Sequence, residues 1–565
     1  MRISWVSLIV AVVAISACAP QVARGPEQST NAQPREMRTL SVVLRNEPFD
    51  LTDTASSRNN MTVAFFVARL VHSDDLDTPM PVLSEAVPAL NTDTWRVFPD
   101  GRMETTFRLR LDLRWHDGTP LTAEDVVFTH RTNATQLAWG ISQSAISPVE
   151  HRAIEEVMAP DPRTVVIRWK QLYADAVRLD MKILPRHILE SVVDEGRSEV
   201  LGAHPYWTTG YVGAGPYRVA QWSQGAYIEG TAFEGYALGR PRIDRVRVTW
   251  SGDPNSTLAR VLAGDADLAL DGAIFYVQAA TLKKEWATDT RGVVLLQPGT
   301  LRFVAGQHRA AYANPASVLD VRVRRATAHA IDYQVLTEAL TEGYGVVAQT
   351  VAPPGVRYYA EVDRTAAKYP YDLRRVEQLI GEAGFAKGAD GWYASPAEGR
   401  HSPELMGVAE GQEGQETTVI ADFLRRAGID AQLRLVPQEM LQQSDEMKST
   451  YPAWRTNYGL GSPKNLSSDR VLGSRAATVD NRWSGTNKMG WNHAAHDALY
   501  DRWTRALDSS EADQILIQIA RTVMDELPYI PTYFDPTVAA HSANLAGPSL
   551  GFGTAWQNVA QWSWK

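Results

Sequence analysis

The chain has 565 residues, a formal net charge of -9 and a hydrophobic content of 44%. This length is too great for one hydrophobic core, so we expect two or three domains. The acidic balance, without a long basic run, argues against binding to a nucleic-acid backbone. The only cysteine is Cys18, which excludes a disulfide framework and a catalytic or metal-binding cysteine elsewhere.

The N-terminal segment predicts export. One basic residue precedes an apolar run of 13 residues, Trp5 to Ala17, which is shorter than the roughly 20 residues that a membrane span needs. We therefore predict a signal peptide at 1–17. The run ends in Ile-Ser-Ala-Cys, which resembles a bacterial lipobox and implies a lipid on Cys18; a secreted protein without lipid is the alternative. The polar stretch 18–37 predicts a flexible tether.

The stretch RWHDGTPLTAEDVVFTHR, from Arg114 to Arg131, is rich in titratable groups and invites a catalytic or metal-binding interpretation. The alternating residues before it predict a strand, and HDGT predicts a turn. Thr122 is placed to cap a following helix, with Asp125 three residues later. The acidic residues of this stretch are then explained by their stabilising effect at the start of the helix. Their spacing fits no metal-binding pattern and no catalytic triad.

Further along the chain, strands alternate with helices. The range 321–340 predicts one long helix, and 371–385 predicts another that stops at Gly384. Glu404 to Pro437 reads as strand, helix and strand. Such β-α-β units indicate an α/β fold with parallel strands and helices on the faces of a sheet.

Several stretches, in a fixed order, resemble the bacterial extracellular solute-binding proteins of family 5, the substrate receptors of ABC importers for peptides, nickel complexes and some oligosaccharides. The matching stretches run from about residue 40 to about residue 534. They are WHDGTPLTAEDVVFT, GAGPYRV, LAGDADLAL, VRRATAHAID, YDLRRVEQLIGEAGF, AGIDAQL and LPYIPTYF. In this family the HDG stretch is structural, in agreement with the capping argument.

The resemblance implies a two-lobed fold of the type II periplasmic-binding-protein kind, with an extra domain inserted in lobe one. Carried onto this chain, lobe one is 38–80, 205–299 and 525–565, the inserted domain is 81–204, and lobe two is 300–524. The ligand is expected in the cleft, beyond the carboxyl ends of parallel strands. Hinge closure then buries the ligand, and the closed form docks on the membrane permease.

Peptide receptors of the family carry a W-x-x-D-Y stretch whose Asp receives the α-ammonium group of the peptide. The corresponding loop here contains Trp454, Arg455, Thr456, Asn457 and Tyr458. Asn457 cannot neutralise a buried ammonium group, and Arg455 adds positive charge. We therefore expect a ligand without a cationic end, held between Trp454 and Tyr458 as apolar walls. The alternative is that both aromatic residues only pack the loop.

His493, His496 and Asp497 could suggest a transition-metal site, but two histidines are too few for a tight one. Their stretch also resembles a family block that begins a surface helix. We therefore expect no metal and no cofactor. The rival class is a secreted hydrolase, which needs a nucleophile, a base and an orienting group. The sequence has no G-x-S-x-G and no H-E-x-x-H motif.

The expected function is a substrate-binding lipoprotein of an ABC importer, a monomer at the periplasmic or extracytoplasmic face of a membrane. Its expected partners are a solute and the permease with its ATPase, with no nucleic acid. A peptide-like solute is the first candidate. An oligosaccharide, an anionic conjugate or a metal complex stays open as the ligand, and so does a binding module that acts without a transporter.

Overall fold

The computed structural model describes most of the chain. The described ranges are 38–51, 60–74, 78–139, 152–179, 181–270, 272–459, 469–550 and 555–565. The chain divides into two units, 1–37 and 38–565. The predicted signal peptide, the tether and Cys18 belong to the first unit and lie outside the described residues. No helix in the described ranges is long and apolar enough to cross a membrane.

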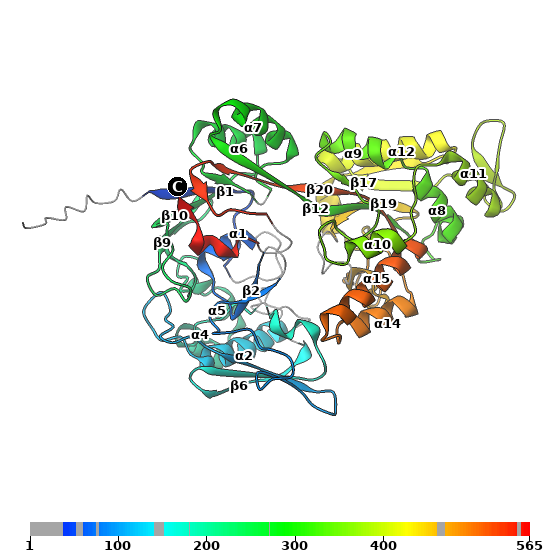
Figure 1. The fold of residues 1–565 in the computed structure, drawn as a ribbon. Coiled ribbons are helices and arrows are strands. Elements are labelled where there is room, and N and C mark those ends of the chain that lie inside the picture. The colour runs from blue at the N-terminus through cyan, green and yellow to red at the C-terminus, as the bar shows by residue number, and fades with distance from the viewer. Residues whose placement is uncertain are drawn as a thin grey trace, which may run out of the picture. The chain divides into compact units, whose positions relative to one another are not determined.

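A large mixed sheet organises the second unit (Figure 1). Its strands follow the order β18 (Gln432–Val436), β17 (Glu404–Val408), β19 (Trp454–Gly459), β12 (Gly292–Gly306), β20 (Tyr529–Ser542), β11 (Leu268–Ala269), β1 (Thr39–Leu44), β10 (Arg245–Trp250), β9 (Tyr227–Ala232) and β8 (Tyr217–Ser223). A further strand, β13 (Val346–Val347), pairs with β20. β1 runs parallel to β10 and β11, and β17 runs parallel to β18 and β19. The predicted α/β class is confirmed.

The two long strands β12 and β20 join the two parts of this sheet (Figure 1). They pair antiparallel from Gly292 to Ala305, with one register shift between Arg302 and Phe303 and another between Pro298 and Leu301. At this shift the strands approach closely, because a Cβ at Gly299 would lie 2.0 Å from Oγ1 of Thr537. Glycine therefore allows the crossing strands to stay paired through the irregularity.

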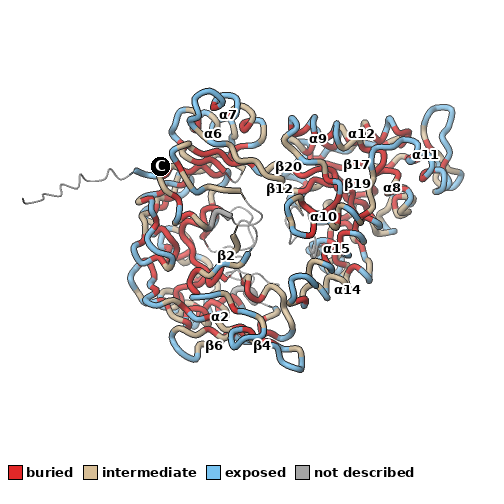
Figure 2. The backbone as a smooth tube through the Cα atoms, viewed as in Figure 1, coloured by how far each residue is buried: buried red, intermediate tan, exposed pale blue. Residues whose placement is uncertain are grey.

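Apolar cores cover both faces of each part of the sheet, and Figure 2 marks the buried residues in red. Between β18 and β20, one face carries α8 (Val321–His329), α9 (Tyr333–Thr341), α11 (Leu373–Glu382) and α12 (Gly411–Ala427). The opposite face carries α10 (Tyr359–Thr365), α13 (Gln438–Gln443), α14 (Ala494–Trp503) and α15 (Ser509–Glu526). Around β1, one face carries α6 (Pro254–Ala263) and α7 (Tyr276–Asp289), and the other carries α1 (Asn60–Phe66), α4 (Arg186–Asp194) and α5 (Ser198–Gly202).

A separate core surrounds a four-stranded sheet whose order is β4 (Trp95–Val97), β5 (Met103–Arg108), β7 (Thr164–Trp169) and β6 (Ile154–Asp161). Helix α2 (Ala123–Trp139) packs beside β6 and β7. The smaller strands are β2 (Val71–Ser73), β3 (Pro79–Pro81), β14 (Ala386–Lys387), β15 (Tyr393–Ser395), β16 (Gly399–Arg400), β21 (Leu545–Ala546) and β22 (Ser563–Trp564). The predicted boundaries of the lobes and of the inserted domain stay a prediction.

The single long helix predicted at 321–340 is wrong, because two helices occupy this range. α8 ends at His329, and α9 begins at Tyr333. Between them Asp332 adopts an extended backbone, and its side chain accepts a hydrogen bond from the Val335 backbone N–H. An Asp at this point caps a new helix more favourably than it continues the old one.

The start of α2 is at Ala123, as predicted, but the cap differs from the prediction. The Thr122 hydroxyl makes no hydrogen bond with the described residues. Instead, the Asp125 carboxylate accepts hydrogen bonds from the Thr122 N–H at 2.9 Å and from the Arg186 N–H at 3.0 Å. These two hydrogen bonds join the start of α2 to the start of α4. The Asp125 side chain that makes them is buried, at 4% exposure.

We predict that Asp125→Ala destabilises the fold far more than Thr122→Ala. The first change leaves two partly buried N–H groups without their acceptor, and each hydrogen bond to a charged group contributes about 1.5–3 kcal/mol. We therefore expect Asp125→Ala to lower the free energy of unfolding by about 3 kcal/mol, and Thr122→Ala to lower it by less than about 1 kcal/mol. Urea unfolding followed by circular dichroism measures both. A larger loss for Thr122→Ala would contradict this account of the cap.

Candidate functional site

The four predicted site residues lie on β19, which is an inner strand between β17 and β12 and not a loop. Side chains alternate between the two faces of a strand. Trp454 and Tyr458 therefore point to the face covered by α12, and Arg455 and Asn457 point to the opposite face. The structure thus separates residues that the sequence analysis placed around one ligand.

Trp454 is fully buried, at 0% exposure. It belongs to the apolar core that contains Leu405 on β17, Val304 on β12 and Ile420 on α12. A side chain with this environment packs the sheet against its helices. The structure therefore favours the packing alternative for Trp454 over a wall of the ligand site.

The carboxyl end of β19 presents neutral polar and aromatic groups. Tyr458 is 52% exposed, and Asn457 is half-buried with its Oδ1 accepting a hydrogen bond from the Tyr458 N–H at 2.9 Å. The Arg302 guanidinium lies 5.2 Å from the centre of the Tyr458 ring. Since β17 runs parallel to β19 and leads into α12, this end of the sheet is where α/β proteins bind ligands.

Beside Tyr458, an ion pair lies inside the protein. Arg302 on β12 donates from Nε to Oε2 of Glu416 on α12 at 3.0 Å, and its Nη2 contacts the same oxygen. The side chains are 7% and 0% exposed. The second oxygen of Glu416, Oε1, is buried and accepts no hydrogen bond from the described residues. Burial raises the pKa of the Glu416 carboxyl to about 7, more than the attraction of Arg302 lowers it.

A second acid, Asp535, lies on the neighbouring strand β20. The Gln412 side chain donates to the Tyr533 hydroxyl at 3.0 Å and to the Asp535 carboxylate at 3.3 Å. Tyr533 is the cross-strand partner of Arg302. Burial raises the pKa of Asp535, with a smaller opposing effect from Arg302. Asp535 forms no ion pair with the described residues, so it is a candidate acceptor for a cationic ligand group.

Sequence reasoning missed these acids. The signal for Glu416 was available, because Glu413, Glu416 and Ile420 follow helical spacing on the buried face of α12. Acids on an apolar helical face predict a buried charged site. Asp535 carried no comparable signal, since its neighbours Gln412 and Arg302 come from distant parts of the chain.

Arg455 faces away from Trp454 and is 8% exposed. One Nη donates to the Lys448 carbonyl at 3.4 Å, and its Nε makes no hydrogen bond with the described residues. Burial lowers the pKa of this guanidinium. Arg455 therefore supplies a buried positive charge on the same face of β19 as Asn457.

The titratable stretch at 114–131 has structural roles. His116 is 3% exposed, and burial lowers its pKa to about 4, so the ring is neutral. Nε2 lies 3.0 Å from the Gly215 carbonyl, and Nδ1 accepts from the Gly213 N–H at 3.2 Å. Asp117 accepts hydrogen bonds from Thr119 and His187. The HDG turn is thus joined to the GAGPYRV stretch.

The predicted pair of histidines on α14 also has structural roles. Nδ1 of His493 accepts a hydrogen bond from the His496 N–H at 3.1 Å, which caps the helix. Asp497 accepts from the Gly473 N–H at 3.0 Å, and the fully buried His496 packs on the Trp491 ring. These contacts hold α14 against the preceding segment.

Glu416 gives a prediction about pH. An acid whose pKa is higher in the folded chain binds its proton more tightly there, so it favours folding at low pH. This contribution is present below about pH 4.5 and is lost as the pH rises through about 7, a change of about 3 kcal/mol. In Glu416→Gln, the fall in unfolding free energy over this range should shrink by that amount. Urea unfolding at several pH values measures it, with the exposed Glu377→Gln as control; equal slopes in all three proteins would contradict the assignment.

Comparison with known proteins shows the family to which the chain belongs. The model for bacterial extracellular solute-binding proteins, family 5, matches residues 85–473. The oligopeptide-binding protein AppA of Bacillus subtilis is 22% identical over 582 residues, covering 98% of this chain and 97% of AppA. The heme-binding protein A of Haemophilus influenzae is 25% identical over 488 residues, covering 81% of this chain and 79% of that protein.

Solved structures share the fold. NikA from Brucella suis, in complex with Fe(III)-EDTA, superposes with a TM-score of 0.74 at 17% identity, over 93% of this chain and 99% of NikA. AppA from Bacillus subtilis, in complex with a nonapeptide, gives a TM-score of 0.70 at 19% identity, over 94% of this chain and all of AppA, 100%. The chain therefore belongs to the bacterial extracellular solute-binding proteins of family 5, the non-enzymatic receptors of ABC importers.

Proposed function

We propose that this receptor captures a peptide-like solute beside the crossing strands and delivers it to a membrane permease. The observation that carries the proposal is the position of Asn457 and Tyr458 at the carboxyl end of β19, close to Asp535 on the crossing strand β20. Relatives that match over most of this chain are named for oligopeptide and heme binding. A non-peptide solute is therefore the second candidate.

Hinge closure is part of the proposal. The predicted lobe one, 38–80 with 205–299 and 525–565, is joined to lobe two, 300–524, by β12 and β20. A second contact lies far from these strands: the Ala174 N–H of the proposed inserted domain donates to the Thr504 carbonyl at 2.8 Å. Leu507 packs on the core of the same domain. We infer that bending of β12 and β20 at the register shift between Pro298 and Leu301 moves the two lobes relative to each other. This motion forms the second contact on closure and breaks it on opening.

The solute stabilises the closed form only through contacts that the open form lacks. Tyr458 offers an exposed ring, and Asn457 offers an uncharged amide. Arg455 adds positive charge on the Asn457 face. These groups favour an uncharged or anionic part of the solute at β19, such as a blocked peptide end, a sugar or an anionic conjugate.

Identification of the bound solute tests the proposed receptor function. Purified protein is denatured, and the released small molecules are identified by mass spectrometry. We expect one chemical class of solute, near one molecule per chain, which restores the melting temperature when it is added back. Failure to release any solute, together with no thermal stabilisation by peptides, heme or metal chelates, would contradict a receptor function.

We predict that N-acetylated peptides bind more tightly than the same peptides with free amines. Asn457 lacks the charge that holds an ammonium group, and a charge-assisted hydrogen bond of roughly 1.5–3 kcal/mol corresponds to a tenfold to hundredfold change in affinity. Asn457→Asp should reverse the preference by a similar factor. Calorimetric titration of both peptide forms measures it.

Asp535→Asn completes this test. If the native protein prefers the free-amine form and Asp535→Asn removes that preference, then Asp535 holds the ammonium group and the role given to Asn457 is wrong. Asp480→Asn serves as the matched control, since Asp480 is exposed and does not belong to β12, β19 or β20. Trp454→Ala should lower stability by about 3–5 kcal/mol through lost packing.

We also propose that Cys18 carries a lipid anchor. The support is the apolar run that ends in Ile-Ser-Ala-Cys, followed by a polar stretch. A lipid at this position tethers the receptor at the extracytoplasmic face, close to its permease. Cys18→Ser should move the protein from the membrane fraction to the soluble fraction. An unchanged distribution after cell fractionation would show that another feature holds the protein at the membrane.

A further inference from the structure

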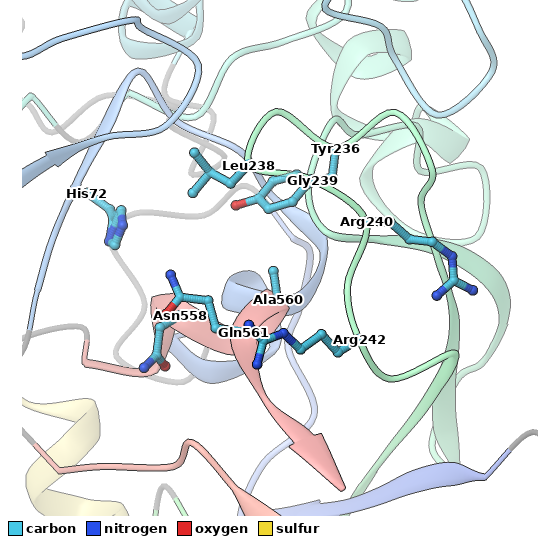
Figure 3. A pocket seen from close by; sticks show the side chains of 9 residues that line it. All are labelled: His72, Tyr236, Leu238, Gly239, Arg240, Arg242, Asn558, Ala560 and Gln561. Atoms are coloured by element: carbon cyan, nitrogen blue, oxygen red, sulfur yellow. The ribbon is translucent and has the colours of Figure 1, made fainter.

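A cavity of about 120 Å³ is lined by residues from three segments (Figure 3). These segments are β2, the stretch between β9 and β10, and the 3-10 helix η7 (Ala555–Gln561), and none of them is near β19 in the sequence. Its polar lining includes His72, Tyr236, Arg242, Asn558 and Gln561. None of the residues assigned to solute capture above lines it. Space of this size holds a polar group of a few heavy atoms.

Tyr236 gives the cavity a directed polar group. The residue is 7% exposed, and Figure 3 shows its hydroxyl pointing into the space between His72 and Asn558. Within the described ranges the hydroxyl makes no hydrogen bond. Burial raises the pKa of this phenol far above its ordinary value, so it keeps its proton and donates. A ligand or a water in the cavity can therefore accept a hydrogen bond from this hydroxyl.

The other polar groups have defined roles. Nδ1 of His72 lies 3.2 Å from the Ser73 carbonyl, and burial lowers the His72 pKa to about 4. The ring is therefore neutral, with Nδ1 donating and Nε2 free to accept. Oδ1 of Asn558 accepts from the Trp562 indole at 2.9 Å, which leaves the Asn558 NH₂ group as a donor.

The charge at the cavity is positive. Arg240 is neutralised by Glu234 and by Asp244, the latter at 2.7 Å. Arg242 is exposed, and in the described part of the chain its guanidinium forms no ion pair and no side-chain hydrogen bond. Figure 3 shows it beside Gln561, at the edge of the same cavity. Two neutral donors, the Tyr236 hydroxyl and the Asn558 amide, thus lie beside one cation, Arg242, that has no ion-pair partner among the described residues.

We propose that this cavity binds a small oxyanion, a phosphate or carboxylate group, held by Arg242, Tyr236 and Asn558. A guanidinium binds either group with two parallel hydrogen bonds, and a phenol and an amide donate to the remaining oxygens. His72 Nε2 accepts from a protonated oxygen of hydrogen phosphate or from a bridging water. The oxyanion comes either from a free ion or from the end of a larger molecule.

The test uses the full chain with inorganic phosphate, acetate and glycerol phosphate as probes, and sodium chloride at equal ionic strength as reference. We expect at least one probe to raise the melting temperature of the native protein. Its affinity should fall about tenfold or more in Arg242→Gln and in Tyr236→Phe, which removes a single oxygen atom. Arg245→Gln, on an exposed arginine of the next strand, should bind as the native protein does.

Two of the probes, inorganic phosphate and glycerol phosphate, separate the two sources of the oxyanion. Tighter binding of inorganic phosphate indicates a free ion, and tighter binding of glycerol phosphate indicates the end of a larger molecule. Circular dichroism checks that the variants fold. Absence of stabilisation by every probe, or equal affinity of the native protein and Arg242→Gln, would overturn the proposal. Since no peptide or other transported solute enters the test, its failure leaves the proposed receptor function standing.

Discussion

The antiparallel pairing of β12 with β20 is the constraint on which the rest of the structure depends. These strands carry β19 on one side and β11 on the other, so both parts of the large sheet are registered to them. A backbone pair of this length keeps its N–H and C=O groups satisfied while the flanking cores remain separate. The register shift at Pro298 and the close approach at Gly299 are the points at which such a pair can bend.

The charged groups follow from this arrangement. Arg302 lies on β12 and Asp535 on β20, and α12 brings Glu416 to the same point from its buried face. Buried ion pairs add little net stability, because desolvation offsets the attraction between the charges. The pKa of Glu416 is raised because the effect of burial on this carboxyl is larger than the attraction of Arg302.

The sequence predicted the fold class because the order of strands, helices and family-like stretches extends over most of the chain. It did not predict the break between α8 and α9, since apolar spacing continues through 321–340 while Asp332 caps a new helix. The candidate site was predicted in part. Residues 454–458 do lie near the crossing strands, but treating them as a loop hid the alternation that buries Trp454 and separates it from Asn457. Asp535 could not be found, because only the folded chain brings it beside Gln412.

Closure about the crossing strands is the central claim, and hydrogen exchange tests it most directly. The Ala174 amide is bonded to the Thr504 carbonyl across the two sides, whereas β12 and β20 are paired along most of their length, with register shifts between Pro298 and Leu301 and between Arg302 and Phe303. Exchange is compared between the protein carrying its solute and the protein freed of it by denaturation and refolding. The account predicts that removal of the solute speeds exchange at Ala174 and leaves the amides of β12 and β20 protected. Unchanged exchange at Ala174, or loss of protection along β12 and β20, would contradict it.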